Sequence, residues 1–305
     1  MKIGLYDVDS YENTGFPNLA LMKISQWHKT QGHQVEHYMP LFHQSYDQVY
    51  ASKVFQYSSS AMITDDMITG GTGLSMEGKL PDYIDQLDPD YSLYDYPHNL
   101  GFLMRGCRFK CDFCVVPKKE GKARSDATID DIWTQRSSNF IVLLDNDFFG
   151  NPHWKERIEE INAYKLRVNF SQGLNIRIIS ERQAAALAST DFRNRTGEYK
   201  AIHFAWDNIN DERTIRRGIK RVVDAGIKAR YMTFYVLIGF NSTHEEDMHR
   251  IQTIDGLGAD PFVMPYNKKD PRQRKLARWV NNKHIFHSSS WDDFTKHAFK
   301  ERVAA

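Results

Sequence analysis

The pattern of apolar and polar positions in the first third of the chain predicts a β–α–β unit. Residues 2–8 (KIGLYDV) form a short apolar run, and residues 34–39 (QVEHYM) alternate as a strand does. Residues 17–32 (PNLALMKISQWHKTQG) lie between them and predict a helix. Pro17 suits its first position, and Gly32 suits the position after its last residue. These elements are typical of a small Rossmann-like α/β domain.

A linker follows this first domain. A further strand is expected in residues 66–73 (DMITGGTG), where it ends in glycines. Residues 77–99 carry prolines among Asp and Tyr residues, which is typical of a connecting segment. We therefore expect a first domain over residues 1–97.

Beyond the linker, strand patterns alternate with helical patterns. One helix is expected between the strand patterns of residues 229–240 and 261–267. It begins with Ser242 and Glu245, which have the spacing of a capping box. Strands that alternate with helices predict a parallel sheet. We expect a partial (β/α)6 barrel over residues 98–270 and a basic helical extension over residues 271–305. The expected strands lie in residues 99–106, 139–147, 166–173, 200–207, 229–240 and 261–267.

Polar side chains gather where these strands end, which is where parallel α/β barrels bind ligands. Within the strands, His203, Thr233 and Tyr235 alternate with bulky apolar residues, so we expect them to face a polar interior. An alternative is that such polar residues only bond one another. The residues expected at the carboxyl edge of the sheet are Asp145, Asn146, Asp147, Gln172, Asp207 and Asn241.

Composition and charge place few further limits on function. Of the 305 residues, 41% are hydrophobic, and 40 Lys and Arg residues stand against 39 Asp and Glu residues. A formal charge of +1 gives no whole-molecule attraction to nucleic acid or to an anionic membrane. The sequence shows neither a membrane-spanning apolar run nor a secretory signal. We expect a cytoplasmic protein that has no membrane partner.

All three cysteines lie in one short stretch, GCRFKCDFC, at Cys107, Cys111 and Cys114. Thiolates bind soft metals and iron–sulfur clusters, and clustered thiols fit a reducing compartment. Three thiolates can hold a 4Fe–4S cluster with one iron left open, and Phe113 can shield it from solvent. A structural zinc site with His98 as fourth ligand is the alternative.

The spacing C-x3-C-x2-C, with an aromatic residue before the last cysteine, resembles the signature of the radical S-adenosylmethionine (SAM) superfamily. Four later segments resemble strand motifs of its cobalamin-domain branch, in the same order. They are LLDNDFFG (143–150), FSQGLNIRIIS (170–180), VLIGFNSTHEED (236–247) and PFVMPYN (261–267).

The resemblance implies an oxygen-sensitive enzyme with a 4Fe–4S cluster on the three cysteines. In this family the open iron chelates SAM, and reduction of the cluster cleaves SAM to a 5′-deoxyadenosyl radical that abstracts hydrogen from a substrate. From the strand alternation, the inward-facing His203, Thr233 and Tyr235 are the candidates for handling the substrate. The resemblance leaves open whether the enzyme is an oxidoreductase or a transferase. It assigns cluster and SAM contacts to Phe113, Asp145, Asn146, Asp147, Gln172, Arg177, Asp207 and Gly239.

The amino-terminal domain resembles the end of a cobalamin-binding domain at residues 67–73 and 89–97. That domain binds cobalt through an Asp-x-His-x-x-Gly loop, and residues 7–18 (DVDSYENTGFPN) take its place here. We therefore expect a degenerate domain that does not bind cobalamin.

Two other functions remain open. Residues 114–125 (CVVPKKEGKARS) resemble the radical SAM methylthiotransferases that modify transfer RNA, although no cysteine precedes Cys107. The other alternative is a non-enzymatic nucleic-acid-binding module stabilised by zinc or a cluster.

Local basic stretches indicate partners. Residues 104–124 hold seven cations and two acids. These cations predict a docking surface for an acidic flavodoxin or ferredoxin, a grip on an anionic substrate, or charges that offset the cluster. Residues 267–284 hold seven cations and Trp279, which indicates either a solvated helix face or an RNA-binding surface.

Overall fold

The computed structural model describes residues 1–10 and 15–296. By packing, the chain divides into two compact units, residues 1–142 and residues 143–305. This division falls within a strand, and the domain boundary expected near residue 97 stays a prediction. Residues 11–14 of the segment that replaces the cobalt-binding loop, and residues 297–305 of the expected helical extension, lie outside the described residues.

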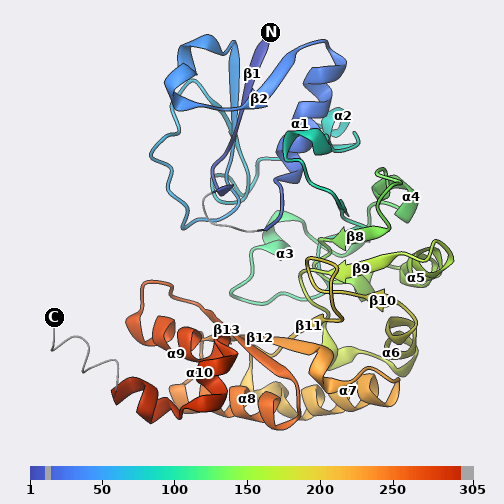
Figure 1. Cartoon of the computed structure of the whole chain (residues 1–305), viewed down its shortest axis with the longest axis vertical. Coiled ribbons are helices and arrows are strands. Elements are labelled where there is room, and N and C mark those ends of the chain that lie inside the picture. Colours follow the sequence, from blue (N-terminus) through green and yellow to red (C-terminus); the bar gives the residue numbers. More distant parts are fainter. Residues whose placement is uncertain (11–14, 297–305) are drawn as a thin grey trace. The chain divides into compact units, whose positions relative to one another are not determined.

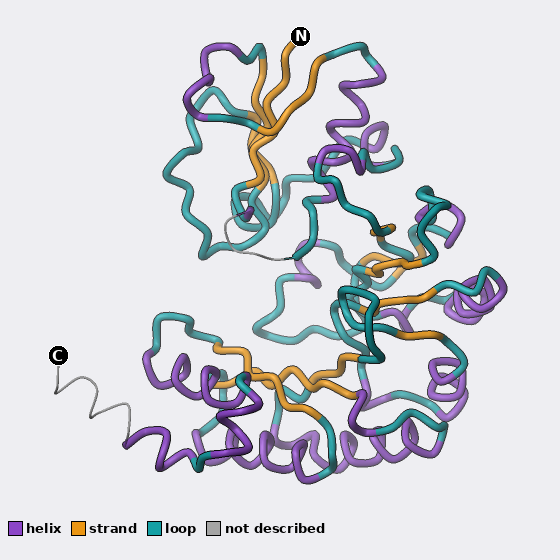
Figure 2. The backbone as a smooth tube through the Cα atoms, in the orientation of Figure 1, coloured by secondary structure: helices purple, strands orange, loops and turns teal. Residues whose placement is uncertain are grey.

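The first unit begins with a four-stranded parallel sheet in the order β2-β1-β3-β4, seen as neighbouring strands in Figures 1 and 2. The expected strands are present, and β3 is an additional one that the sequence pattern did not predict. Helix α1 (Leu19–Thr30) begins after Asn18, whose side chain accepts the N–H of Leu21, so it starts two residues later than expected. The strands are β1 (Lys2–Asp7), β2 (Gln34–His37), β3 (Gln48–Ser52) and β4 (Ile68–Gly70).

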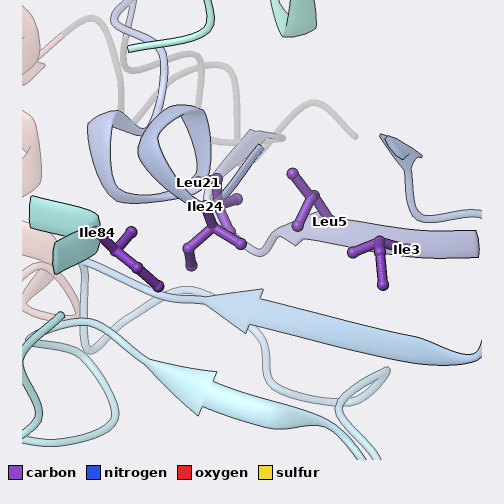
Figure 3. Packing of buried hydrophobic residues seen from close by; sticks show 5 residues of the cluster. All are labelled: Ile3, Leu5, Leu21, Ile24 and Ile84. Carbon is purple, nitrogen blue, oxygen red and sulfur yellow. The ribbon is translucent and has the colours of Figure 1, made fainter. Parts of the chain in front are cut away.

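An apolar cluster holds α1 against this sheet. Ile3 and Leu5 alternate along β1 onto one face, and Leu21 and Ile24 lie about one turn apart on α1. Ile84 of helix α2 (Asp82–Asp85) completes the cluster, as Figure 3 shows. Each buried side chain stabilises the packing by about 1.5–3 kcal/mol. The amino-terminal sheet therefore has its own core.

The remainder of the first unit is made of short elements. The strand expected over residues 99–106 is divided into β5 (Asn99–Gly101) and β6 (Met104–Arg105). Strand β6 pairs with β7 (Arg124–Ser125) in an antiparallel hairpin that encloses the cysteine loop. The other elements are the 3-10 turns η2 (Pro40–Ser45) and η3 (Tyr91–Leu93), helices α3 (Val116–Lys119) and α4 (Ile129–Ile132), and strand β8 (Phe140–Leu143).

The second unit consists of parallel strands and covering helices. Strand β9 pairs with β10, and β11, β12 and β13 form a three-stranded parallel sheet. A bridge between Leu174 and Phe204 joins the end of β9 to β11. Strands β9, β11, β12 and β13 confirm four expected strands, whereas β10 was not expected. The bounds are β9 (Arg167–Phe170), β10 (Asp191–Phe192), β11 (Ile202–Ala205), β12 (Met232–Ile238) and β13 (Asp260–Pro265).

The two faces of this sheet differ as the alternation predicted. Along β12, every second residue from Met232 to Ile238 is buried, and helix α8 contacts this strand. The residues between them, including Thr233 and Tyr235, are partly exposed on the opposite face. Figure 1 shows α7 and α8 running along one side of the sheet. The helices are α5 (Trp154–Ala163), α6 (Glu181–Ala188), α7 (Glu212–Asp224), α8 (His244–Gly256), α9 (Pro271–Asn281) and α10 (Lys283–Ser288).

The protein is thus of mixed α/β architecture with several parallel sheets. Within residues 1–10 and 15–296, no helix has the length and apolar character needed to span a lipid bilayer. The remaining short turns of the second unit are η4 (Phe148–Gly150), η5 (Ile176–Ile178), η6 (Ile209–Asp211) and η7 (Ala229–Tyr231).

Candidate functional site

The cysteine loop leaves β6 and returns through α3 to β7. The N–H of Gly106 donates to the Glu120 carboxylate at 2.8 Å, and the N–H of Cys107 donates to the Gly121 carbonyl at 3.2 Å. Gly106 has a φ of +76°, and a Cβ there would lie 2.3 Å from the Lys122 carbonyl oxygen. Only glycine fits this position, because any side chain would meet the opposite backbone. The base of the loop is therefore closed by its own chain.

The three cysteines are partly buried thiols. The N–H of Phe109 points to the sulfur of Cys107 at 3.4 Å, and the N–H of Cys114 donates to the Cys111 carbonyl at 2.9 Å. Hydrogen bonds from backbone N–H groups to sulfur are among the interactions that tune iron–sulfur clusters. The three thiols therefore lie in one short loop, and thiolates are the ligands that iron–sulfur clusters use.

Within the described part of the chain, no group of three or more His, Cys, Asp and Glu side chains, the three cysteines included, is close enough together to hold a metal ion. His98, the alternative zinc ligand, packs edge-on against Phe140 with ring centroids 4.9 Å apart. Phe113, expected to cover the cluster, is partly buried.

Arg105 and Lys119, two of the seven cations near this loop, are partly buried against internal structural partners. The guanidinium of Arg105 contacts the Asp126 carboxylate at 3.2 Å and lies 3.7 Å from the centre of the Phe102 ring. The ammonium of Lys119 donates to the Ser75 carbonyl at 3.0 Å and also to the Gly78 carbonyl, and burial lowers the pKa of Lys119. Lys119 therefore stabilises the packing of the first unit, and it is not part of the expected docking surface.

The other cations remain at the surface. Arg124 is exposed and donates to the carbonyl of Glu120 at 2.7 Å. The side chains that we call the exposed basic set are Arg108, Lys110, Lys118 and Lys122.

In the second unit, the carboxyl ends of successive parallel strands lie along one edge. The N–H and hydroxyl of Ser171 both donate to the carbonyl of Leu143, at 3.1 and 2.8 Å, so the ends of β8 and β9 are adjacent. The N–H of Leu174 donates to the His203 carbonyl at 2.8 Å, and the N–H of Trp206 donates to the Tyr235 carbonyl at 2.9 Å. The expected edge residues therefore follow neighbouring strand ends.

The acids at this edge differ in burial. Asp145 and Asp147 are only 4% and 2% exposed, although they lie in the connection after β8. Asn146 is partly buried, and Gln172 is exposed after β9. Buried carboxylates at a strand end can bind a cation or an ammonium group, because charged groups in the interior need partners.

Asp207 and Arg177 have defined partners. The carboxylate of Asp207 accepts the N–H of Leu237 at 3.2 Å, and burial raises the pKa of Asp207. The nearby positive charges of Arg250 and Arg177 act against this rise. Arg177 itself forms an ion pair with Asp211 at 3.0 Å. Binding of a ligand carboxylate by Arg177 would therefore have to compete with Asp211.

Gly239 has a structural reason to be glycine. Its φ is +71°, and a Cβ there would lie 2.2 Å from the amide nitrogen of Gln273 in α9. Its N–H donates to the carboxylate of Asp247 at 3.2 Å. A side chain at this position would have to push aside the end of the Gln273 side chain, and the positive φ itself favours glycine.

The sequence pattern gave no expectation of the ion pair that organises this edge. Arg250 is fully buried on α8 and contacts the carboxylate of Asp247 at 2.5 Å. Its guanidinium also donates to the carbonyls of Trp206 and Leu237, at 2.6 and 2.8 Å. This arginine therefore joins the ends of β11 and β12. The sequence offers one indication of this ion pair. Asp247 and Arg250 are three residues apart, and they lie on the same buried face of α8 as Ile251 and Ile254.

The three residues expected to handle substrate do share one face. His203 and Thr233 are register partners, and the rings of His203 and Tyr235 stack with centroids 5.3 Å apart and 2° between their planes. Burial lowers the pKa of His203, while the nearby Phe170 backbone partly offsets that change. Burial also raises the pKa of Tyr235. At neutral pH this face therefore presents a neutral imidazole stacked on a neutral phenol.

Trp279 does not support the RNA-binding interpretation. Its side chain is 4% exposed, and its indole N–H donates to the Ser289 carbonyl at 3.1 Å. Its ring packs against Phe286 and Trp291. Because this indole lies in the interior between α9 and α10, it cannot stack on bases, whereas Arg272, Arg274 and Arg278 are exposed on the solvated face.

No family model, curated protein or solved structure matches the chain.

Proposed function

We propose that the protein is a radical SAM enzyme. The observation that carries this proposal is the cysteine loop, in which three partly buried thiols lie within one short segment whose base is closed by Gly106 and the β6–β7 pairing. The motif order along residues 99–267 supports it. We further infer that the parallel strands of residues 98–270 belong to a partial (β/α)6 barrel, because the strand ends of the second unit succeed one another along one edge.

In this proposal, Cys107, Cys111 and Cys114 hold a 4Fe–4S cluster as thiolates. The Phe109 N–H stabilises the charge on the Cys107 sulfur, and the exposed cations between the cysteines offset part of the remaining negative charge. When bound, the cluster and SAM supply a 5′-deoxyadenosyl radical that removes hydrogen from a substrate.

The second unit contributes binding groups. Asp145 and Asp147 lie in the connection after β8, where their carboxylates could contact the ammonium of SAM. The neutral His203 and Tyr235 rings offer a stacking surface and hydrogen-bonding groups to a substrate without adding charge. Arg250 acts as a positioning residue, since it fixes the strand ends that carry Asp207 and Gly239.

The exposed basic set fits an acidic electron donor of the flavodoxin or ferredoxin type. Exposed charges of one sign steer an oppositely charged partner and speed its association. A cluster on reduced thiols requires a reducing compartment, which supports the assignment to the cytoplasm.

The test is anaerobic reconstitution of the full chain with iron and sulfide, followed by addition of SAM and dithionite. We expect about four irons per chain, an EPR signal of the reduced cluster, and formation of 5′-deoxyadenosine. Replacing any one of the three cysteines by alanine abolishes all three results. Val115→Ala, at the exposed residue beside Cys114, retains them. A single tightly held zinc, or a verified cluster that yields no 5′-deoxyadenosine, contradicts the proposal.

A further inference from the structure

The amino-terminal sheet contains a topological switch point that the proposed function does not use. The order β2-β1-β3-β4 places β2 on one side of β1, and β3 and β4 on the other side. In open parallel α/β sheets, ligands bind outside the carboxyl ends of the strands at such a point. Asp7 is the last residue of β1, Asp9 lies two residues beyond it, and Lys53 follows β3. The switch point therefore lies among buried charged residues.

Lys53 is the unusual residue in this group. It is only 6% exposed, and its ammonium donates to the hydroxyl of Ser60 at 2.8 Å. Among residues 1–10 and 15–296, no carboxylate oxygen lies within 4.0 Å of this nitrogen. A buried ammonium is costly unless it is paired, and one neutral hydroxyl leaves two of its N–H groups unmatched.

The neighbouring acids are already satisfied by groups of the fold. Asp9 accepts the N–H groups of Val54 and Phe55 and the hydroxyl of Ser58. Asp7 accepts the Tyr94 hydroxyl at 2.8 Å and the Asp9 N–H at 3.2 Å. Both carboxylates therefore accept hydrogen bonds from fixed donors, although burial raises the pKa of Asp7. Among the described residues, the Lys53 ammonium has the neutral Ser60 hydroxyl as its partner.

Two glycines hold the lysine in place. A Cβ at Gly71, which has a φ of +93°, would lie 2.2 Å from the Lys53 carbonyl oxygen. A Cβ at Gly73 would lie 2.8 Å from the Lys53 side chain. The N–H of Gly73 donates to the Lys53 carbonyl at 2.9 Å, and the N–H of Lys53 donates to the Gly70 carbonyl at 3.0 Å. The glycine loop thus closes directly on Lys53.

The start of helix α1 lies beside the same strand end. The Asn18 amide donates to the hydroxyl of Ser52 at 2.9 Å, which joins the helix start to the end of β3. The first turn of α1 contains no acidic residue. A helix amino terminus carries partial positive charge and favours an anion nearby. The start of α1 is therefore joined to the end of β3 through Ser52, the residue before Lys53.

We propose that Lys53 binds a phosphate-bearing small molecule at this switch point. One phosphate oxygen replaces the Ser60 hydroxyl on the ammonium, which compensates the buried charge. Ser60 is an exposed residue of the connection between β3 and β4, so its displacement leaves the sheet intact. Ammonium groups are established ligands of phosphate in proteins. This site is independent of the cysteine loop and of SAM cleavage.

The experiment is isothermal titration calorimetry of the full chain with inorganic phosphate, pyrophosphate and AMP at constant ionic strength. We expect saturable binding to the unmodified protein, tightest for AMP if the natural ligand is a nucleotide. Lys53→Met should weaken binding about tenfold or more, because it removes a charge-assisted hydrogen bond. Lys79→Met removes the same charge from an exposed lysine of the same unit and should bind as the unmodified protein does.

A second variant tests the site without altering the buried lysine. Ser60→Glu places a carboxylate beside the Lys53 ammonium from an exposed position, so it should compete with the ligand and reduce its affinity. Three results overturn the proposal. They are the absence of binding by any of the three phosphate compounds, equal affinity in the Lys53→Met or Ser60→Glu variant, and binding of malonate as tight as that of phosphate.

Discussion

Acid should destabilise the amino-terminal unit through His28, the last buried residue of α1. Its side chain is 2% exposed, with Nδ1 2.8 Å from Nδ1 of His33 and Nε2 3.1 Å from the Tyr50 hydroxyl. One of the two facing Nδ1 atoms must accept the hydrogen bond, so His28 and His33 cannot both carry a proton there. Burial, and next the charge of His33, lower the pKa of His28 to about 4.

The sign and size of the effect follow from this lowered pKa. The unfolded chain takes up the proton near pH 6.5, whereas the folded chain does so only near pH 4. Stability from this group is therefore complete above pH 6.5 and is lost as the pH falls toward 4. At about 1.36 kcal/mol for each pH unit, the loss is about 2 kcal/mol at pH 5 and about 3 kcal/mol below pH 4.

The assay is urea unfolding at pH 8 and pH 5, with hydrogen exchange of peptides covering α1 and β3 used to identify the relevant transition. His28→Gln removes the titrating group and should reduce the difference in unfolding free energy between the two pH values by about 2 kcal/mol. His153→Gln changes an exposed histidine and should leave the difference as it is. If His28→Gln loses as much stability at pH 5 as the unmodified chain does, the reasoning is wrong.

Four further predictions concern the cysteine loop and the strand edge. Gly106→Ala should cost about 1–3 kcal/mol of backbone strain and lower the iron content after reconstitution, which metal analysis measures, because its Cβ would meet a carbonyl oxygen 2.3 Å away. Arg250→Met should lower the unfolding free energy by about 3–5 kcal/mol in urea titrations, because it leaves the buried Asp247 carboxylate without its cationic partner. Breaking the exposed Lys220–Asp224 pair on α7 is the control and should cost about 0.5 kcal/mol or less. Lys118→Glu with Lys122→Glu should slow turnover driven by flavodoxin and spare turnover driven by dithionite; equal loss with both reductants contradicts docking at the exposed basic set. Lys119→Glu should instead destabilise the first unit, which thermal unfolding detects, because that lysine holds two backbone carbonyls.

Local sequence patterns predicted those features of the fold that depend on residues close together in the chain. The alternation along β12 indicated which residues are buried, because successive side chains of a strand point to opposite faces. A helix was expected from Ser242 with Glu245, but α8 is capped by Thr243 with Glu246, one residue later. The Ser242 hydroxyl instead donates to the Asp247 carboxylate at 2.7 Å. That carboxylate also forms the buried ion pair with Arg250, so tertiary contacts rather than the capping-box spacing determine the role of Ser242.

Contacts between distant segments had no such local signal. The antiparallel β6–β7 hairpin joins residues on either side of the cysteine loop, so a continuous strand over residues 99–106 was a wrong expectation. Strand β10 has only two residues, so its pairing with β9 defines it more than its own apolar pattern does. Strand β3 spans five residues and pairs with both β1 and β4. Trp279 and Lys119 looked like surface binding residues, yet one fills an apolar interior and the other binds backbone carbonyls.

The sequence by itself determined the α/β alternation, the position of the polar residues at the strand ends, and the three thiols of the cysteine loop. Periodicity and spacing encode these features within a few neighbouring residues. The tertiary structure decided which charges are used internally and which remain at the surface, because burial depends on segments far apart in the chain. Lys53 shows the difference most clearly: it is an ordinary lysine after a short strand in the sequence, and a buried ammonium beside a glycine loop in the folded protein.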